Sequence, residues 1–237
     1  SVMDGLPNKE VTCLYQYKTN ITFIGTVAGL AYYNGEDIIQ LNTIEQLKNR
    51  TIRCITKFAD NIWIGTDYGI VIITKEESNF KFKKTLETLD GKDLGNIYGL
   101  AVGKDGAIWI ATSQNGLFYY TPDKTIHYTA PEHLINNDIY TLYIDEFFQL
   151  WIGYLSGGAS VFDGEKFVHF NSENQLGNKT ILCITRNKNG QVFFGTAENG
   201  LYLKNEDKFY NITKNDGLSS DVVTSAIIDS YNPNEVW

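Results

Sequence analysis

The sequence of 237 residues contains little proline, methionine or cysteine and no long apolar run. A membrane-spanning helix needs about 18 or more consecutive apolar residues, and no segment approaches that length. The three cysteines are odd in number and form no Cys-x-x-Cys pair, which argues against a disulfide framework and against a metal site. Positive charge is also scarce, with 20 Lys and Arg against 28 Asp and Glu. Nucleic acid and anionic lipid attract clustered positive charge, so we expect this region to bind neither nucleic acid nor a membrane.

The abundant residue types are those of β-proteins. Aromatic residues make up 14% of the chain, and 21 glycines accompany many Ile, Val and Thr residues. A hydrophobic content of 43% supports a packed core. The chain opens Ser1-Val2-Met3 without an initiator Met or a signal-like segment, so we expect a preceding segment to have been removed.

An internal repeat runs through the whole chain. Each copy has an apolar run around an aromatic anchor, followed a few residues later by Gly and a second apolar run, as in Ile62-Trp63-Ile64-Gly65-Thr66 and then Gly69-Ile70-Val71. Five copies are complete, and the sequence ends as a sixth begins at Val236-Trp237. The anchors, spaced 40 to 46 residues apart, are Phe23, Trp63, Trp109, Trp151, Phe193 and Trp237.

Each copy is predicted to form four short strands, A to D. In the fifth copy these strands are Thr180–Arg186, Gln191–Thr196, Gly200–Leu203 and Lys208–Ile212, with the turn signal Asn187–Gly190 after strand A. A four-stranded antiparallel meander with this period is typical of a β-propeller blade. We therefore predict an all-β propeller as a single region, 1–237, with blades at about 9–42, 51–84, 96–129, 138–171 and 180–213 and a partial blade at 222–237.

The cysteines and glycines have structural interpretations within this repeat. Cys13, Cys54 and Cys183 share one position of strand A, where the other copies carry Gly99, Thr141 and Ser225. The position favours a small residue, as expected where inner strands crowd around an axis. The Gly-Thr step after strand B and the Gly that opens strand C are predicted to serve the B–C turn, which needs permissive backbone. No phosphate-binding motif precedes a helix, so we expect no cofactor.

The repeat resembles the two-component regulator propeller repeat over essentially all 237 residues. The shared features are the aliphatic-Trp-Ile-Gly-Thr run, the following Gly-Leu with aromatics, and an Asp-Gly-Leu linker, here Asp216-Gly217-Leu218 and Asp4-Gly5-Leu6. The resemblance implies a periplasmic sensor ectodomain of a hybrid two-component system histidine kinase of Bacteroidetes, sensing oligosaccharides to control glycan-utilisation genes. It also implies seven blades, so we expect this chain to be part of a longer propeller. The implied partners are a second propeller and a sandwich domain of the same protein, with a homodimer also open.

Strand direction places the B–C turns and D–A linkers on one face of a propeller, where ligands commonly bind. The fourth copy departs most from the repeat there, because Tyr154 replaces Thr and is followed by Leu155-Ser156-Gly157-Gly158. An aromatic ring beside glycines suits the apolar face of a sugar. The alternative is that all of these are ordinary solvated turn residues. The predicted ligand-binding residues of these turns are Tyr154, Ser156, Asp67, Tyr68, Gln114, Asn115, Glu198 and Asn199.

Two further departures from the repeat suggest contacts. Arg53 stands in strand A where other copies carry Thr, Tyr or Leu, and it either meets a ligand carboxylate or pairs with a structural acid. Phe147 and Phe148 occupy the A–B turn of the fourth copy, where other copies have polar residues. Two Phe at a turn tip predict a protein contact, unless both rings fold back onto their own blade.

Catalysis has little support in the residues. The repeat is also similar to the streptogramin lyase propellers, which use a catalytic His, but His127 and His169 fall in outer strands here and His133 in a linker. No nucleophile motif is present, so we predict no catalytic residues. Three functions stay open: a non-catalytic oligosaccharide sensor, a scaffold for protein contacts, and a propeller lyase or hydrolase.

Overall fold

The computed structural model describes residues 2–77, 79–172, 175–229 and 236 of the chain. The chain divides into two compact units, Ser1–Ile126 and His127–Trp237. In both, the described residues form mainly short antiparallel strands, as the repeat predicts.

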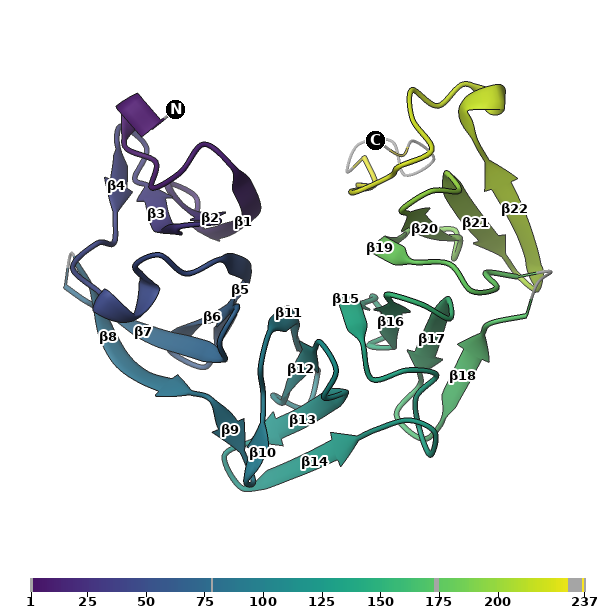
Figure 1. Cartoon of the computed structure of the whole chain (residues 1–237), viewed down its shortest axis with the longest axis horizontal. Helices are drawn as coiled ribbons and strands as arrows, with labels where there is room; N and C mark the ends of the chain where they lie inside the picture. The colour runs from purple at the N-terminus through teal and green to yellow at the C-terminus, as the bar shows by residue number, and fades with distance from the viewer. Residues whose placement is uncertain (1, 78, 173–174, 230–235, 237) are drawn as a thin grey trace. The chain divides into compact units, whose positions relative to one another are not determined.

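The first unit is built from consecutive four-stranded sheets with strand orders β1-β2-β3-β4, β5-β6-β7-β8 and β11-β12-β13-β14. The first strands of the sheets lie next to one another, β1 beside β5 and β5 beside β11, and the fourth strands lie on the outside (Figure 1). The strands are β1 (Val11–Lys18), β2 (Ile21–Thr26), β3 (Gly29–Tyr33), β4 (Ile38–Gln40), β5 (Ile52–Phe58), β6 (Asn61–Thr66), β7 (Ile70–Glu76), β8 (Asn79–Leu86), β11 (Ile97–Val102), β12 (Ile108–Thr112), β13 (Leu117–Thr121) and β14 (Lys124–Tyr128), which runs across the division between the units.

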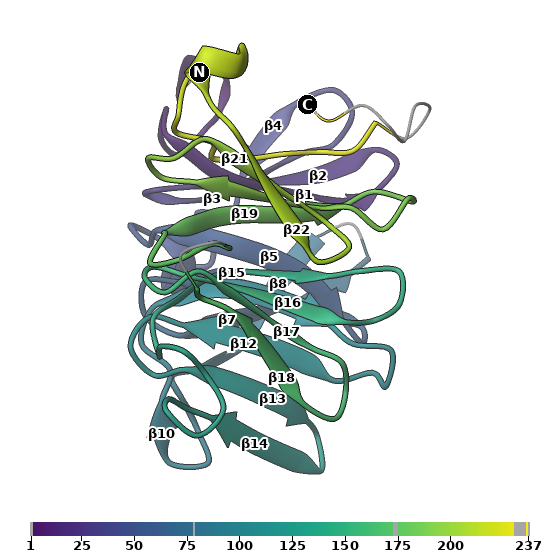
Figure 2. The same ribbon diagram turned by 90° about the vertical axis from the view of Figure 1, so that its right-hand side faces the viewer.

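The second unit repeats this arrangement in two sheets of order β15-β16-β17-β18 and β19-β20-β21-β22. Figure 2 shows these two sheets lying one above the other, with β15 and β19 in contact. The strands are β15 (Ile139–Ile144), β16 (Leu150–Tyr154), β17 (Ala159–Phe162), β18 (Phe167–Phe170), β19 (Ile181–Arg186), β20 (Val192–Thr196), β21 (Leu201–Asn205) and β22 (Lys208–Ile212).

The aromatic anchors of the repeat lie in the second strand of each sheet and form its core. Phe23, Trp63, Trp109, Trp151 and Phe193 expose at most 6% of their surface. Phe23, Trp63 and Trp151 each belong to a cluster of buried Ile and Leu residues from the same and the neighbouring sheet of their unit. The anchor Trp237 of the sixth copy lies outside the described residues, and Val236 next to it forms an isolated bridge with Ile228.

Every first strand carries a bulge near its start. The pairing register with the second strand shifts at the same place in all five four-stranded sheets, so that one residue is left without a partner across the ladder. These unpaired residues are Thr12, Arg53, Tyr98, Tyr140 and Leu182.

Some short elements were not predicted. A two-stranded hairpin, β9 (Thr88–Leu89) and β10 (Lys92–Asp93), follows the second sheet. Three 3-10 turns, η1 (Val2–Asp4), η2 (Glu45–Leu47) and η3 (Lys214–Asp216), lie before a first strand or between blades. The last is fixed by a capping box in which Thr213 and Asp216 bond each other's backbone and side chains. Such single turns leave no periodicity in the sequence.

The expected role of the strand B glycines was wrong. Gly25, Gly65, Gly153 and Gly195 lie within strands, not in the turn, and none has a left-handed backbone. Each is instead packed against the small residue opposite on strand A and an aliphatic side chain or backbone further on. The glycines around strand C do serve the turn, since Gly69, Gly116 and Gly200 have φ values of 74° to 76°.

Candidate functional site

A buried threonine holds each regular B–C turn. The threonine at the end of the second strand donates its hydroxyl to the carbonyl of the glycine that closes the turn, at 2.8 or 2.9 Å. The residues between them are thereby presented at the edge of the sheet. These threonines, all fully buried, are Thr26, Thr66, Thr112 and Thr196.

The turn of the second sheet carries a charged aromatic cluster. Tyr68 exposes 56% of its surface, and the Arg50 guanidinium lies over its ring with Cζ 5.1 Å from the centroid. Arg50 Nη1 is 3.8 Å from Asp67 Oδ1, which is a charge contact that is too long for a hydrogen bond. Asp67 Oδ1 is buried and makes no hydrogen bond within the described part of the chain. The cluster therefore presents an exposed ring together with a partly exposed guanidinium and a partly exposed carboxylate, whose Oδ1 atom is the buried one.

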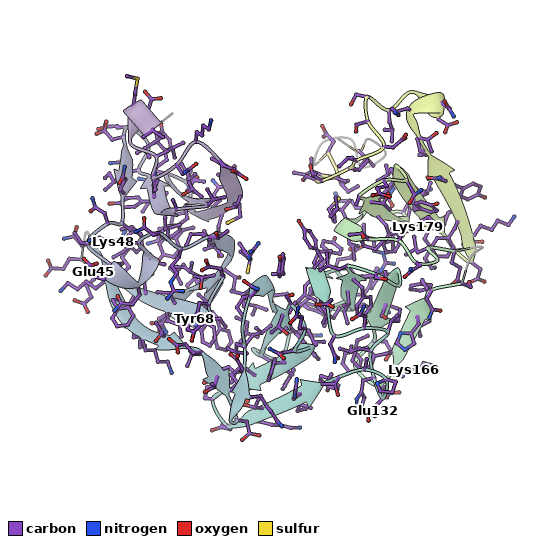
Figure 3. All side chains as sticks on the ribbon, in the orientation of Figure 1. Glu45, Lys48, Tyr68, Glu132, Lys166 and Lys179 are labelled. Carbon is purple, nitrogen blue, oxygen red and sulfur yellow. The ribbon has the colours of Figure 1, made fainter. Side chains whose placement is uncertain are left out.

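Sequence reasoning found Asp67 and Tyr68 but missed Arg50. Arg50 lies at the end of the D–A linker, just before β5, and this linker shares its face with the B–C turns. A search of the linkers for charges opposite the turn residues would have found it. Tyr68 and the neighbouring linker pair Glu45 and Lys48 are labelled in Figure 3.

The turn of the third sheet adjoins this cluster through the linker residue Gly95. The N–H of Gly69, directly after Tyr68, donates to the Gly95 carbonyl at 2.7 Å. The Asn115 amide lies against Gly95, and Gln114 adopts a left-handed backbone with φ of 75°. The first unit thus brings Asp67, Tyr68, Gln114 and Asn115 to one edge, as the strand directions predict.

A shallow pocket of about 220 Å³ lies on the corresponding turns of the first sheet. It is formed by the B–C turn and by the linker that contains η2, the two types of segment that strand direction assigns to the ligand face. Its lining residues, none of which was singled out from the sequence, are Pro7, Ala28, Gly29, Leu30, Gln40, Leu41, Asn42, Leu47, Lys48 and Asn49.

The structure places Tyr154 differently from the expected exposed turn residue. It is the last residue of β16, and its side chain is fully buried. Burial raises its pKa to about 12, so the phenol stays protonated. Since no face of the ring is accessible, Tyr154 has nothing on which a sugar could stack. A Tyr here satisfies the same need for a buried residue that Thr meets in other sheets.

The Tyr154 hydroxyl begins a buried chain of hydrogen bonds. It lies 3.1 Å from Ser160 Oγ and receives a backbone hydrogen bond from Ile135. Ser160 Oγ lies 2.7 Å from His169 Nδ1, and Ser160 is fully buried. Burial lowers the pKa of His169, which favours the neutral ring. The chain leads from the end of strand B to the surface of the outer strand β18.

The other predicted turn residues of the second unit remain at its surface. Ser156 donates to Asn178 Oδ1 at 2.5 Å, which joins the fourth B–C turn to the following linker. Glu198 and Asn199 are exposed, and the Asn199 backbone N–H donates to Thr196 Oγ1 at 2.9 Å. Ser156 and the Glu198–Asn199 turn thus stay available for a ligand.

Arg53 occupies the bulge position of β5 and stacks on Tyr98, the bulge residue of β11. Its Cζ is 4.4 Å from the Tyr98 ring centroid. Its Nε is buried and makes no hydrogen bond within the described residues. The contact is therefore a cation–π pair between neighbouring inner strands.

Phe147 and Phe148 lie in the A–B turn of the fourth sheet and expose 65% and 51% of their surfaces. The Arg186 guanidinium of β19 lies over the Phe147 ring, with Cζ 4.6 Å from the centroid. Arg186 also pairs with the buried carboxylate of Asp145. The turn is thus anchored to the adjacent sheet while its aromatic tip stays open to solvent.

The three histidines lie where the sequence places them, His127 in β14, His169 in β18 and His133 in the linker after β14. Among the described residues, no three His, Cys, Asp or Glu side chains are grouped so that they could hold a metal ion. Within the same residues, no helix is long and apolar enough to cross a membrane.

Comparison with solved structures gives several matches. The chain is similar to the extracellular domain of BT3049 from B. thetaiotaomicron, assigned to a hybrid two component system, with a TM-score of 0.83 and 22% identity over 95% of this chain and 32% of the other. The extracellular domain of BT4673 from the same organism has a TM-score of 0.61 and 20% identity, covering 95% and 36%. Virginiamycin B lyase from Staphylococcus aureus has a TM-score of 0.65 and 17% identity, covering 87% and 72%.

The chain spans about a third of the length of the two extracellular domains. No family model and no curated protein matches the sequence. The chain nevertheless has the β-propeller fold of the ectodomains of Bacteroides two-component systems, in agreement with the resemblance that its repeat indicates.

Proposed function

We propose that this chain is a non-catalytic, ligand-sensing part of the periplasmic ectodomain of a hybrid two-component sensor, and that its ligand is an oligosaccharide. The observation that carries the proposal is the similarity to the BT3049 extracellular domain, which extends over 95% of this chain at a TM-score of 0.83. The propeller in the whole protein would have seven blades and would be followed by the further domains that the resemblance implies.

The turn edge of the first unit supports a sugar as the ligand. A pyranose presents an apolar C–H face and a rim of hydroxyls, and the exposed Tyr68 ring offers a surface for the first. Asp67 and Arg50 supply an acceptor and donors within reach of the hydroxyls. Gln114 and Asn115 extend the polar surface along the same edge.

Signalling would follow from a change in the arrangement of the ectodomain. A sugar that binds two blades or domains at once favours the arrangement in which both contacts are made. The shift is limited by the difference in its affinity for the two arrangements. A site built from loops on rigid blades fits this role, because the sheets fix the positions of the loops and the loops contact the ligand.

The test is a thermal-shift screen of this chain and of the whole ectodomain against plant, host and microbial oligosaccharides. A ligand at about 100 times its Kd adds about 2.7 kcal/mol of stability, which raises Tm by several degrees in a protein of this size. Tyr68→Ala should remove the shift. Tyr210→Ala is the matched control, since Tyr210 is 48% exposed on the outer strand β22, away from the turns.

The outcomes separate the alternatives. A shift in this chain that Tyr68→Ala removes supports the site and identifies the sugar class. A shift confined to the whole ectodomain moves the site outside these blades. Absence of any shift in both proteins contradicts the oligosaccharide proposal.

The exposed Phe147–Phe148 tip favours a second function, a scaffold for protein contacts. Stabilisation by partner domains alone, without any sugar effect, would establish it. Because the chain is similar to virginiamycin B lyase, each oligosaccharide should also be tested for chemical conversion by the protein. If a product forms and His133→Ala abolishes its formation, the non-catalytic proposal is overturned.

A further inference from the structure

A pocket of about 420 Å³ opens on the outer side of the second unit, apart from every turn residue considered above. It lies between the end of β14 with its following linker and the turn that joins β17 to β18. Glu132 and Lys166 at its border are labelled in Figure 3. Its lining residues are Tyr128, Glu132, His133, Phe162, Gly164, Glu165, Lys166, Phe167 and His169.

Three aromatic rings of this pocket form a corner. Tyr128 is inclined at 81° to His133 and at 66° to Phe167, with centroids 5.3 Å away in both cases. His133 and Phe167 are themselves inclined at 66°, with centroids 6.2 Å apart. Phe162, which also lines the pocket, packs against Phe167 with ring centroids 4.6 Å apart. The three rings meet at steep angles, which suits a compact group that contacts several rings better than a flat pyranose, which stacks on one ring face.

The charges around the corner favour a cation. Two carboxylates, Glu132 and Glu165, line the pocket against one ammonium, that of Lys166. Asp163 accepts backbone N–H bonds from Lys166 and Glu165, and these bonds lower its pKa. The positive charge of Lys166 lowers this pKa further. The chain as a whole carries a net charge of −8, so cations are attracted to its surface.

A second histidine, His169, lies at the border of the pocket. It is held through Nδ1 by the buried Ser160 hydroxyl. This bond fixes the orientation of the ring at the border of the pocket. The Tyr128 hydroxyl stays protonated, because burial raises its pKa.

We propose that this pocket binds a small organic cation, with an ammonium or methylated ammonium group seated among Tyr128, His133 and Phe167 and paired with Glu132 and Glu165. The electron-rich faces of aromatic rings attract such groups, and nearby carboxylates add charge attraction. The site is independent of the proposed oligosaccharide site, so either proposal can fail without the other.

The test uses choline as the probe and the carbon analogue of choline, in which a tert-butyl group replaces trimethylammonium, as its matched neutral control. Binding to the purified chain is measured by saturation-transfer NMR and by calorimetry at low ionic strength. We expect choline to bind and its neutral analogue to bind at least about ten-fold more weakly, because both the rings and the carboxylates act on the charge.

Two variants assign the binding to the pocket. Phe167→Leu keeps an apolar side chain and removes one ring, and it should weaken choline about two- to five-fold. Glu132→Gln combined with Glu165→Gln should weaken choline and flatten its salt dependence. Phe147→Leu is the control, since Phe147 is an exposed ring of the same unit outside the pocket, and it should leave binding unchanged.

Equal binding of choline and its neutral analogue would overturn the proposal, because the pocket would then recognise apolar bulk alone. Absence of choline binding at about 50 mM would overturn it too, since that affinity is below any specific site. Binding of choline that Phe167→Leu leaves intact, in a variant with unchanged Tm, would place the cation elsewhere and would equally contradict the site.

Discussion

The thiol of Cys13 occupies the space into which a side chain on Gly25 would project. The two residues are partners across β1 and β2, and a Cβ on Gly25 would lie 2.5 Å from Cys13 Sγ and 2.8 Å from Ile52 Cγ2. The third sheet makes the reverse choice at the same pair, with Gly99 opposite Ala111. One member of each pair is therefore small enough for the sheets to approach.

This relationship predicts that a larger residue at position 25 can be partly compensated by a smaller one at position 13. Gly25→Ala should destabilise the chain by about 1–3 kcal/mol, because the methyl group overpacks the space between β1 and β5. Adding Cys13→Gly should recover part of the loss, measured by urea unfolding as a double-mutant cycle. The steric account would be refuted if Gly25→Ala were as stable as the parent. It would also be refuted if the free-energy losses of the two single variants summed to the loss of the double variant.

The thiols should be poorly reactive in the folded chain. Burial raises the pKa of Cys13 to about 11 from its usual 9.0 and also raises the pKa values of Cys54 and Cys183. A two-unit rise lowers the thiolate fraction about 100-fold at pH 8, so alkylation of Cys13 by iodoacetamide should slow by about that factor relative to the unfolded chain. The corresponding stability is fully present below pH 9 and is lost as pH rises through the folded pKa. Similar rates in native and unfolded protein would contradict this prediction.

Removing the charge of Asp145 should be strongly destabilising. Its side chain is fully buried, accepts N–H bonds from Phe147 and Gln149 at 2.9 Å and from Trp151 Nε1 at 3.0 Å, and pairs with Arg186. Asp145→Asn leaves the guanidinium without its carboxylate partner, and we expect a loss of about 3–5 kcal/mol in the free energy of unfolding. Lys48→Gln is the control, because its pair with Glu45 is exposed. A loss no greater than that of the control would show that the buried pair is unimportant.

His169 should make the chain less stable in mild acid. Its Nδ1 lies 2.7 Å from Ser160 Oγ, and protonation makes both ring nitrogens donors, so that Ser160 Oγ must then accept from Nδ1. Because burial lowers its folded pKa, the stability is present above the usual value of 6.5 and is lost as pH falls through the folded pKa. His169→Gln should therefore reduce the difference in Tm between about pH 7 and pH 5. An unchanged pH profile in His169→Gln would exclude this linkage.

The aromatic tip of the fourth sheet should contribute to association. Phe147→Ser with Phe148→Ser removes both exposed rings, so we expect weaker self-association of the whole ectodomain or weaker binding of its neighbouring domains, measured by sedimentation velocity. Val168→Ser, an exposed apolar residue of β18, is the control. Unchanged association in the double variant would sink the docking hypothesis.

The strand pattern was predictable from sequence because each strand is specified locally. In the fifth copy the predicted strand Lys208–Ile212 coincides with β22, and strands A and B agree within one residue. The glycine of strand B was misinterpreted because its reason is not local. Its neighbours are a small residue across the ladder, a thiol in three of four sheets, and a residue about 27 to 32 positions further on, such as Ile52 for Gly25.

The candidate site was only partly predictable for a similar reason. A departure from the repeat identifies a residue that differs from its equivalents, but it does not show whether the side chain of that residue is buried or exposed. Tyr154 broke the pattern and proved to be buried, whereas Arg50, in a linker without a repeat pattern, meets Tyr68. The aromatic pocket was missed because its rings come from β14, a linker and β18, so no single copy of the repeat contains it.

The bulges at the starts of the first strands have a consequence for protein engineering. Each leaves one residue outside the pairing ladder, and the five residues found there, Thr12, Arg53, Tyr98, Tyr140 and Leu182, share neither size nor charge. The scaffold thus already tolerates five unlike side chains at equivalent sites. A combinatorial library randomised at these positions, with Arg53 and Tyr98 varied as a pair because they stack on each other, would diversify the inner strands without changing the pairing ladder.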